Sequence, residues 1–249
     1  MLKEERHKMI ISEVELHNRV LLTDLAEKLN VSIDTIRRDV KELDTAKQLK
    51  KVHGGAIALG YTNLAPYNEN IYAQADKIKI ASKALSLIKP GHIILIHGGT
   101  TCFELAKLIP NKLEITCFTT SPIVALELLR KKGVDVIFIG GRLSKESQIS
   151  IGASVILQLL EINVDISFIG TGYVDVDFGL TEFDFESVQV KKAIVKSSKK
   201  TVLLSISEKL NSKQRYKTCG INAIHTMITE LNPEDAVLEN FRIQNLRLL

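Results

Sequence analysis

The sequence has few of the residues that stabilise secreted proteins or hold metals. Of 249 residues, only three are cysteine, five are proline and none is tryptophan. Cys102, Cys117 and Cys219 are far apart and form no CxxC pair, so they suggest neither a disulfide framework nor a zinc site. We expect all three to be reduced and mostly buried, and we expect no cofactor.

The sequence also lacks a membrane-spanning segment and a strong excess of charge. No apolar run is long enough to cross a bilayer, and the N-terminal MLKEERHKMI has charges where a signal peptide needs an apolar block. A cytoplasmic protein without a membrane partner is expected. The net charge is +4, and residues 1–56 contain eleven Lys and Arg against ten Asp and Glu. Binding to a polyanion must therefore be argued from where the charges lie.

The first 57 residues have the pattern of short helices followed by a hairpin. Residues 3–17 have one apolar stripe, and Thr23 is a suitable N-cap for a helix over residues 24–29 that ends in a turn at Asn30 and Val31. Ser32 is the expected N-cap of a third helix, whose inward-facing residues recur at spacings of three and four: Ile33, Ile36, Val40 and Leu43.

The exposed face of this third helix carries hydroxyl groups and basic side chains: Ser32, Thr35, Arg37, Arg38 and Lys41. Arginine bonds guanine edges or clamps phosphates, and hydroxyl groups at a helix N-terminus suit backbone phosphates. The alternative is an ordinary solvated face with weak ion pairs. Those pairs would be Arg37 with Asp39 and Arg38 with Glu42.

The segment after the third helix favours DNA binding over the solvated face. Lys50, Lys51 and His53 lie in a short extended stretch that ends at two glycines, as expected of a wing along a phosphate backbone. VSIDTIRRDV followed by KKVHGGA resembles the signature of DeoR-family transcriptional regulators. The resemblance implies a winged helix-turn-helix that binds a double-stranded DNA operator. Lys47 stands where that family usually has a glycine, so we expect either a residue other than glycine in the left-handed conformation at this helix end or a slightly different wing angle.

The rest of the chain predicts a second, α/β domain. A linker over residues 58–75 is expected to separate a DNA-binding domain at 1–57 from a domain at 76–249. The second domain opens with a helical pattern of apolar residues at Ile78, Ala81, Leu85 and Ile88. Short apolar runs then alternate with helices, which is typical of a mostly parallel sheet covered on both faces. The runs are residues 93–96, 115–118, 134–139, 166–169, 202–204 and 227–229, and the helices are 102–109, 122–132, 153–161 and 184–198.

Loops at the carboxyl ends of such strands are candidate ligand sites. In His97-Gly98-Gly99-Thr100-Thr101, glycines let the backbone approach an anion and threonines add donors, although a Gly-Gly turn without a ligand explains this loop equally well. Polar loops after the other strands make a shared site the better interpretation: residues 119–121, 140–142, 170–172, Asp175 and 179–181. Candidate charge partners, each also explained by a solvated position, are Glu186, Lys191, Lys192 and Lys209.

The resemblance to the DeoR family continues through this domain. It rests on GGTT at 98–101, TTS at 119–121, FIGGRL at 138–143, DISFIGTGYVDVDFGLT at 165–181 and VKKA at 190–193. It implies a homo-oligomer of two or four subunits, with a sensor domain that is related in fold to ribose-5-phosphate isomerase and CoA transferases and binds a phosphorylated sugar or similar metabolite. The effector-binding candidates are His97, Gly99, Thr100, Thr101, Thr120, Ser121, Gly141, Gly170, Asp175, Lys191 and Lys209.

Two positions depart from the family pattern. His97 and Gly98 stand where the family has an aspartate in D-[SA]-G-T-T, and Ile206 replaces the aspartate of LLxDxSK. The loss of both carboxylates predicts an unusual effector. His97 either carries a positive charge toward a phosphate or, as we favour, is a neutral, hydrogen-bonded residue at a strand end.

These patterns together favour a sequence-specific DNA-binding regulator, a repressor of carbohydrate-metabolism genes controlled by a phosphorylated metabolite. One alternative is a sugar-phosphate isomerase with a DNA-binding appendage, in which Glu186 or Asp175 is the base. With His97 and Ile206 at two acidic positions of the family, however, the pocket is poorly supplied with carboxylates, and we expect no enzyme activity. A third possibility is a constitutive DNA-binding protein whose second domain only oligomerises.

Overall fold

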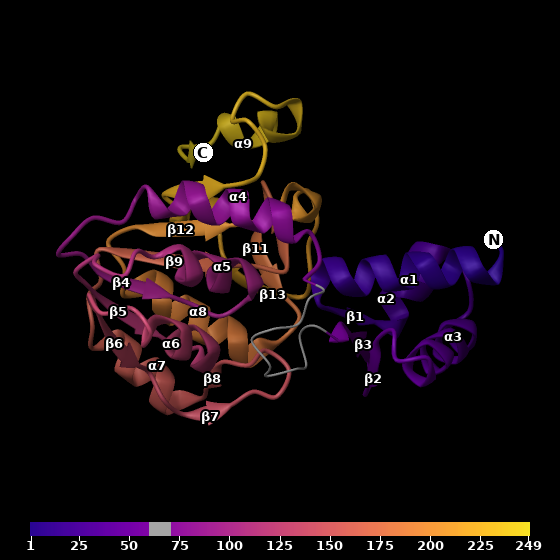
Figure 1. Ribbon diagram of the computed structural model, residues 1–249. Coiled ribbons are helices and arrows are strands. Elements are labelled where there is room, and N and C mark those ends of the chain that lie inside the picture. The colour runs from indigo at the N-terminus through magenta and orange to yellow at the C-terminus, as the bar shows by residue number, and fades with distance from the viewer. Residues whose placement is uncertain (60–70) are drawn as a thin grey trace. The chain divides into compact units, whose positions relative to one another are not determined.

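The chain forms two compact units, Met1–Tyr72 and Ala73–Leu249. The structure is a computed structural model that describes residues 1–59 and 71–249 (Figure 1). Most of the linker expected over residues 58–75 lies outside the described residues.

The helices of the first unit are α1 (Lys3–His17), α2 (Leu22–Leu29) and α3 (Ile33–Thr45). Their apolar faces meet in one core, in which Ile10, Leu25 and Ile36 are almost inaccessible to water. Ser32 caps α3, because its hydroxyl oxygen accepts a hydrogen bond from the backbone N–H of Thr35. The helical order and this cap agree with the expectation from sequence.

Two details of this unit differ from that expectation. α2 begins at Leu22, so Thr23 lies inside the helix and does not cap it. The reason is that β1 (Arg19–Leu21) leads into α2 without a loop. Ile33, expected to face inward, is 37% exposed because it is the first residue of α3 and precedes the turn that packs on the core.

The predicted wing is present as an antiparallel hairpin of β2 (Lys50–Val52) and β3 (Gly55–Ile57). β3 also pairs with β1, so it is the central strand of the order β1-β3-β2. Gly54 turns the hairpin with φ +70°, a conformation that suits glycine. A Cβ at Gly55 would lie 2.3 Å from the carbonyl oxygen of Val20, so the close approach of β3 to β1 also requires glycine.

The second unit is built on a seven-stranded parallel sheet with the order β15-β14-β12-β9-β4-β5-β6. Its strands are β4 (Ile93–Ile96), β5 (Ile115–Thr119), β6 (Val134–Phe138), β9 (Ile166–Gly170), β12 (Thr201–Leu204), β14 (Thr226–Ile228) and β15 (Arg247–Leu248). All the apolar runs predicted from the sequence are strands of this sheet, which confirms the α/β fold class.

Helices cover both faces of this sheet: α4 (Gln74–Leu85), α5 (Thr100–Leu108), α6 (Pro122–Leu128), α7 (Ala153–Leu160) and α8 (Phe185–Lys196). Leu95 and Ile169 belong to the core cluster that contains residues of α7 and α8. Successive residues of a strand point to opposite faces, so the buried Ile94 and Phe168 face the layer formed by α4, α5 and α6.

Short elements that the sequence did not predict complete this unit. They are the antiparallel sheet of β10 (Tyr173–Asp175), β11 (Gly179–Glu182) and β13 (Tyr216–Cys219), the hairpin of β7 (Arg142–Leu143) and β8 (Ser150–Ile151), the turns η2 (Ser207–Lys209), η3 (Ile221–Ala223) and η4 (Ala236–Leu238), and α9 (Glu239–Arg242). Elements of two to four residues are too short for a hydrophobic period to reveal them.

The buried face of α4 differs from the predicted one at Ile78. Ile78, which was assigned to the apolar face, is 39% exposed, whereas Lys77, Ile80, Ala81 and Ala84 are buried. The predicted Ala81 and Ile88 are buried, so the prediction was wrong at Ile78, where a lysine, Lys77, occupies the buried side instead.

The cysteines of the second unit are unreactive, free thiols. Burial raises the pKa of Cys102 and of Cys117 to about 12, and that of Cys219 to about 11. Within the described ranges, no helix combines the length and apolarity needed to cross a membrane.

Candidate functional site

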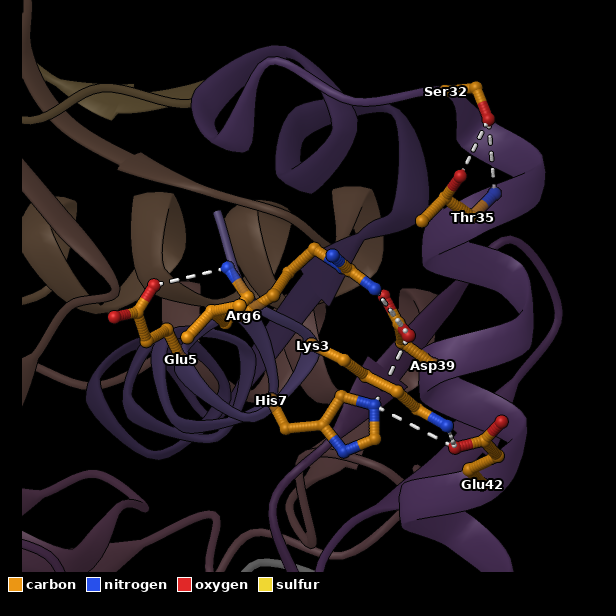
Figure 2. Close-up of polar contacts among 9 residues, drawn as sticks. Lys3, Glu5, Arg6, His7, Ser32, Thr35, Asp39 and Glu42 are labelled. Atoms are coloured by element: carbon orange, nitrogen blue, oxygen red, sulfur yellow. Dashed lines mark hydrogen bonds and ion pairs between the residues drawn. The ribbon is translucent and has the colours of Figure 1, made fainter.

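The candidate recognition helix α3 is anchored to α1 through Asp39. Arg6 donates two hydrogen bonds to the Asp39 carboxylate, and Nε2 of His7 lies 3.1 Å from its Oδ1 (Figure 2). Burial by itself would raise the pKa of Asp39, but the hydrogen bonds from Arg6 and His7 outweigh burial and lower it. The charged carboxylate thus fixes the rotation of α3 against α1.

Neither of the solvated ion pairs considered for this helix forms. Arg37 pairs with Asp34, and Glu42 lies 2.6 Å from Nζ of Lys3 on α1 (Figure 2). In the part of the chain that the structure describes, the side chain of Arg38 has no hydrogen-bond or ion-pair partner. Its guanidinium group is therefore available to another molecule.

Donors gather on α3 and on the wing. The hydroxyl oxygens of Ser32 and Thr35 lie 2.9 Å apart at the start of α3 (Figure 2). The basic residues of the predicted DNA-binding set are all exposed: Arg37, Arg38, Lys41, Lys50, Lys51 and His53. Among described residues, the side chains of Lys41, Lys50 and Lys51 have no carboxylate partner. The first unit thus presents unpaired positive charge on the two elements that a winged helix-turn-helix places on DNA, while the role of each residue stays a prediction.

Four loops of the second unit meet at the carboxyl edge of the large sheet. β9, β4, β5 and β6 are neighbours in that order, so the loops near Gly170, His97, Thr120 and Gly140 are adjacent. Nδ1 of His97 lies 2.8 Å from Oγ1 of Thr120, and this contact joins two of the loops. The structure therefore brings together the loops that were selected from the sequence.

His97 is a neutral member of this group. It is 2% exposed, and burial, with a smaller contribution from nearby Lys191, lowers the pKa of His97 well below its ordinary value. It matches the neutral, hydrogen-bonded residue that we favoured, and it is not a cation directed at a phosphate. Ile206 is buried as well, so an apolar side chain occupies the second position where the family has an aspartate.

The loop after β4 has the geometry of an anion site. Gly99 is the N-cap of α5 and has φ +108°, a conformation that other residues rarely adopt. A Cβ at Gly98 would lie 2.3 Å from Cγ2 of Ile149, so this loop also passes close to its neighbours. The first turn of a helix leaves N–H groups unpaired, and here Thr100 and Thr101 form that turn.

Buried lysines add positive charge to this region. Lys209 donates a hydrogen bond of 3.2 Å to the carbonyl oxygen of Thr171, in the loop after β9, and Lys191 pairs with Glu182. Burial lowers the pKa of Lys209 to about 8. Burial and, less strongly, repulsion by Lys209 lower the pKa of Lys77 to about 7. An anionic ligand would stabilise the charged form of each of these groups.

Sequence reasoning missed Lys77 and Glu104. Glu104 on α5 is 1% exposed, accepts a hydrogen bond of 3.2 Å from Gln74 and lies 2.6 Å from Nζ of Lys107. Lys77 was detectable in principle, because it is in helical phase with the buried Ile80.

Ser150 of β8 is another residue that the sequence did not reveal. Its hydroxyl group is buried and has no hydrogen-bond partner among the described residues. Its backbone N–H donates to the carbonyl oxygen of Thr120, so it lies beside the loop after β5. An unpaired buried hydroxyl costs free energy unless a ligand or water bonds it.

Several predicted site residues have structural roles. Oδ1 of Asp175 accepts the N–H groups of Asp177 and Phe178 and so closes the turn between β10 and β11. A Cβ at Gly141 would lie 2.5 Å from Cγ2 of Val155, so packing requires glycine there. Their part in effector binding stays a prediction.

The carboxylates considered for isomerase chemistry are not poised as buried bases. Glu186 has a side chain that is 44% exposed and forms an ion pair with Arg142. The Asp175 carboxylate is engaged in its own turn.

Comparison with known proteins identifies both units. The DeoR-like helix-turn-helix domain matches residues 6–61, and the DeoR C-terminal sensor domain matches residues 73–231. Among solved structures, ribose 5-phosphate isomerase A from Methanocaldococcus jannaschii is similar with a TM-score of 0.40 and 20% identity, over 54% of this chain and 53% of that one.

Relatives that match along the whole chain include bacterial repressors. The chain is 30% identical to the HTH-type transcriptional repressor GlcR of Bacillus subtilis (strain 168), over 100% of this chain and 96% of GlcR. It is 27% identical to the glycerol-3-phosphate regulon repressor of Escherichia coli (strain K12), over 100% of this chain and 99% of that protein. With a DNA-binding unit and a sensor unit that match in this order along the chain, the protein belongs to the DeoR family of transcriptional regulators.

Proposed function

We propose that this regulator represses a carbohydrate-metabolism operon and releases its operator when a phosphorylated sugar or polyol binds the second unit. α3 enters the major groove and the wing follows the phosphate backbone, as the unpaired charge of Arg38, Lys50 and Lys51 supports. Ligand binding changes the relative placement of two DNA-binding units in a homo-oligomer and thereby lowers operator affinity.

The ligand class is argued from the buried ammonium group of Lys209. Among the described residues of the second unit, it donates a hydrogen bond to the carbonyl oxygen of Thr171 and forms no ion pair with a carboxylate. Buried charges normally have a compensating charge. A phosphate group at the start of α5 would supply it, and it would be accessible to the hydroxyl group of Ser150.

The similarity to other repressors agrees with this proposal. The Escherichia coli relative is named as a repressor of the glycerol-3-phosphate regulon, which supports a role in the metabolism of a phosphorylated compound. An isomerase role has no comparable support, because Glu186 is exposed and paired with Arg142.

A ligand panel tests the sensor. Thermal unfolding and operator release are measured with phosphorylated sugars and polyols, and with the same compounds lacking phosphate. At least one phosphorylated compound should raise the unfolding temperature and release the operator. Equal effects of the compounds without phosphate, or no effect of any compound, would contradict the proposal. Turnover of a sugar phosphate that Glu186→Gln abolishes would establish the enzyme instead.

A matched pair of serine variants locates the ligand. Ser150→Ala should weaken the effect of the active compound and leave operator binding unchanged, whereas Ser154→Ala, at an exposed position of α7, should change neither. If both variants respond to the compound like the wild type, the ligand does not contact Ser150.

Operator binding is tested with single basic residues. Arg38→Ala should lower operator affinity, and Lys51→Ala should weaken binding to every DNA sequence and reduce the salt slope by about one. Lys8→Ala makes the same change of charge at an exposed position of α1 and serves as the control. Unchanged affinity of the Arg38 and Lys51 variants would show that another surface binds DNA.

A further inference from the structure

The edge strand β6 is incompletely covered on both faces. β6 ends the large sheet and, within the described residues, pairs only with β5. Ile137 is 38% exposed and Phe138 is 43% exposed. Consecutive residues of a strand point to opposite faces, so apolar surface is open above and below the same edge.

The helices beside β6 extend this apolar surface. α6 packs on β6 (Figure 1). α7 is joined to the loop after β6 by a hydrogen bond of 3.1 Å from Nε2 of Gln158 to the carbonyl oxygen of Gly140. α6 exposes Leu126, and Leu129, directly after this helix, is exposed too, while α7 exposes Leu157 and Leu160. Together with the two strand residues they form the β6 edge surface: Leu126, Leu129, Ile137, Phe138, Leu157 and Leu160, of which the leucines are 51–67% exposed.

The backbone of β6 is also open to pairing. Proteins protect sheet edges with short strands, charged residues or proline. β15, at the opposite edge, has only two residues, whereas β6 has five, with Asp135 as its one charged residue and no proline. The N–H of Ile139 donates to Thr119 of β5, so by alternation the N–H groups of Val136 and Phe138 point to the open side.

We propose that a second copy of this chain docks on the β6 edge surface, with the two β6 strands antiparallel. A twofold axis perpendicular to the sheet produces this pairing and keeps each helical layer on its own side. α6 then contacts α6 of the other copy, and α7 contacts α7, so leucines meet leucines in both layers. With Val136 on the axis, Asp135 lies opposite an isoleucine and not opposite a second aspartate.

The available area suits a stable dimer. Six apolar side chains that are about half exposed would bury roughly 400–600 Å² in each copy. A standard interface buries about 800 Å² per partner, of which somewhat more than half, about 450–500 Å², is apolar. A second copy thus covers the apolar surface on both faces of the β6 edge and pairs with its open backbone. A single helix or peptide would cover only one face or only the backbone.

The oligomeric state of the full chain tests this surface. Sedimentation is measured over a range of concentrations for the wild type, for Leu126→Glu combined with Leu157→Glu, and for Ile243→Glu. Ile243 is 79% exposed and lies just beyond α9, so it controls for the exchange of an exposed apolar residue for a charge. The double variant should raise the dimer dissociation constant by about 100-fold or more, and the control should leave it unchanged.

A backbone variant tests the strand pairing itself. Val136→Pro removes an N–H that points away from β5, so it leaves the internal ladder intact and blocks an added strand. It should weaken the dimer while thermal unfolding still shows a folded second unit. A monomeric wild type, equal dissociation constants for the double variant and the control, or an undisturbed dimer of Val136→Pro would each overturn the proposal. Sugar-phosphate binding is measured separately, so failure here leaves the effector assignment intact.

Discussion

Replacing Asp39 with asparagine tests how α3 is held in position. The substitution keeps the shape of the side chain but removes the negative charge of the carboxylate, which accepts two hydrogen bonds from Arg6 and lies beside His7. The side chains of Arg6 and His7 are only 12% and 20% exposed, so water replaces the lost partner incompletely. The side chain of Asp39 is only 3% exposed, so water does not reach this position to solvate the groups left without the carboxylate.

The expected loss follows from this partial burial. A hydrogen bond to a charged group contributes about 1.5–3 kcal/mol, and breaking a fully buried ion pair costs about 3–5 kcal/mol. Since some water reaches Arg6 and His7, Asp39→Asn should reduce the stability of the first unit by about 2–3 kcal/mol. For a unit of this size that corresponds to a fall of roughly 10–20 °C in its unfolding temperature.

Calorimetry of the full chain at several pH values measures this loss. The pKa of Asp39 is lowered on folding, so its stabilisation is complete above the unfolded value of about 3.9 and disappears as the pH falls through the lower folded value. The difference between wild type and variant should vanish in the same acid range. Asp34→Asn removes the partner of Arg37 from a pair whose side chains are 53% and 66% exposed, and should cost less than about 0.5 kcal/mol. Equal losses for the two variants would refute the anchoring role of Asp39.

Three further predictions concern the helix end, the buried lysine and the glycine loop. Lys47 has φ +55°, so Lys47→Gly should stabilise the first unit by about 0.5–1 kcal/mol in urea unfolding, and a loss of stability would show that its side chain makes stabilising contacts. The pKa of Lys77 is about 7 in the folded state and about 10.4 when unfolded, so stability of the second unit should rise with pH between these values. Lys77→Met should flatten this rise of stability with pH, and Lys79→Met, at an exposed position, should not. Equal slopes of stability against pH for the two variants would contradict the lowered pKa of Lys77. Thr100→Ala with Thr101→Ala should abolish the metabolite effect in operator-release assays and retain unliganded binding, whereas loss of both would indicate a structural role for the loop.

Most strands of the large sheet could be predicted because the central ones are buried on both faces and form short apolar runs. The run Ile93–Ile96 is apolar throughout and is followed by a loop with two glycines, and Ile115–Thr119 is followed by the polar residues Thr120 and Ser121, so the strands were located to within a residue or two. The hairpin of β7 and β8 contains two residues in each strand, and tertiary packing alone determines it. The buried face of α4 was placed wrongly at Ile78, because a lysine, Lys77, occupies the buried side there.

Some site residues could likewise be predicted from the sequence, whereas others depend on tertiary packing. The exposed Arg38 and Lys51 could be selected because a short motif specifies both their chemistry and their element. The partner of Asp39 could not, because Arg6 lies 33 residues earlier and only the packing of α1 on α3 brings the two together. Ser150 could not be predicted either, since its lack of a hydrogen-bond partner among the described residues becomes visible only when its surroundings are known.

The central position of β3 makes the first unit sensitive to force along the chain. The backbone N–H of Ala58, directly after β3, donates to the carbonyl oxygen of Asn18, and β3 itself is bonded to both β1 and the wing strand β2. The segment that continues toward the second unit therefore leaves from the one strand that holds the wing to the helices. Tension on that segment acts on the wing strand β2 and on β1, which leads into α2, at the same time, so a small displacement of β3 would shift the wing relative to the helices of the first unit.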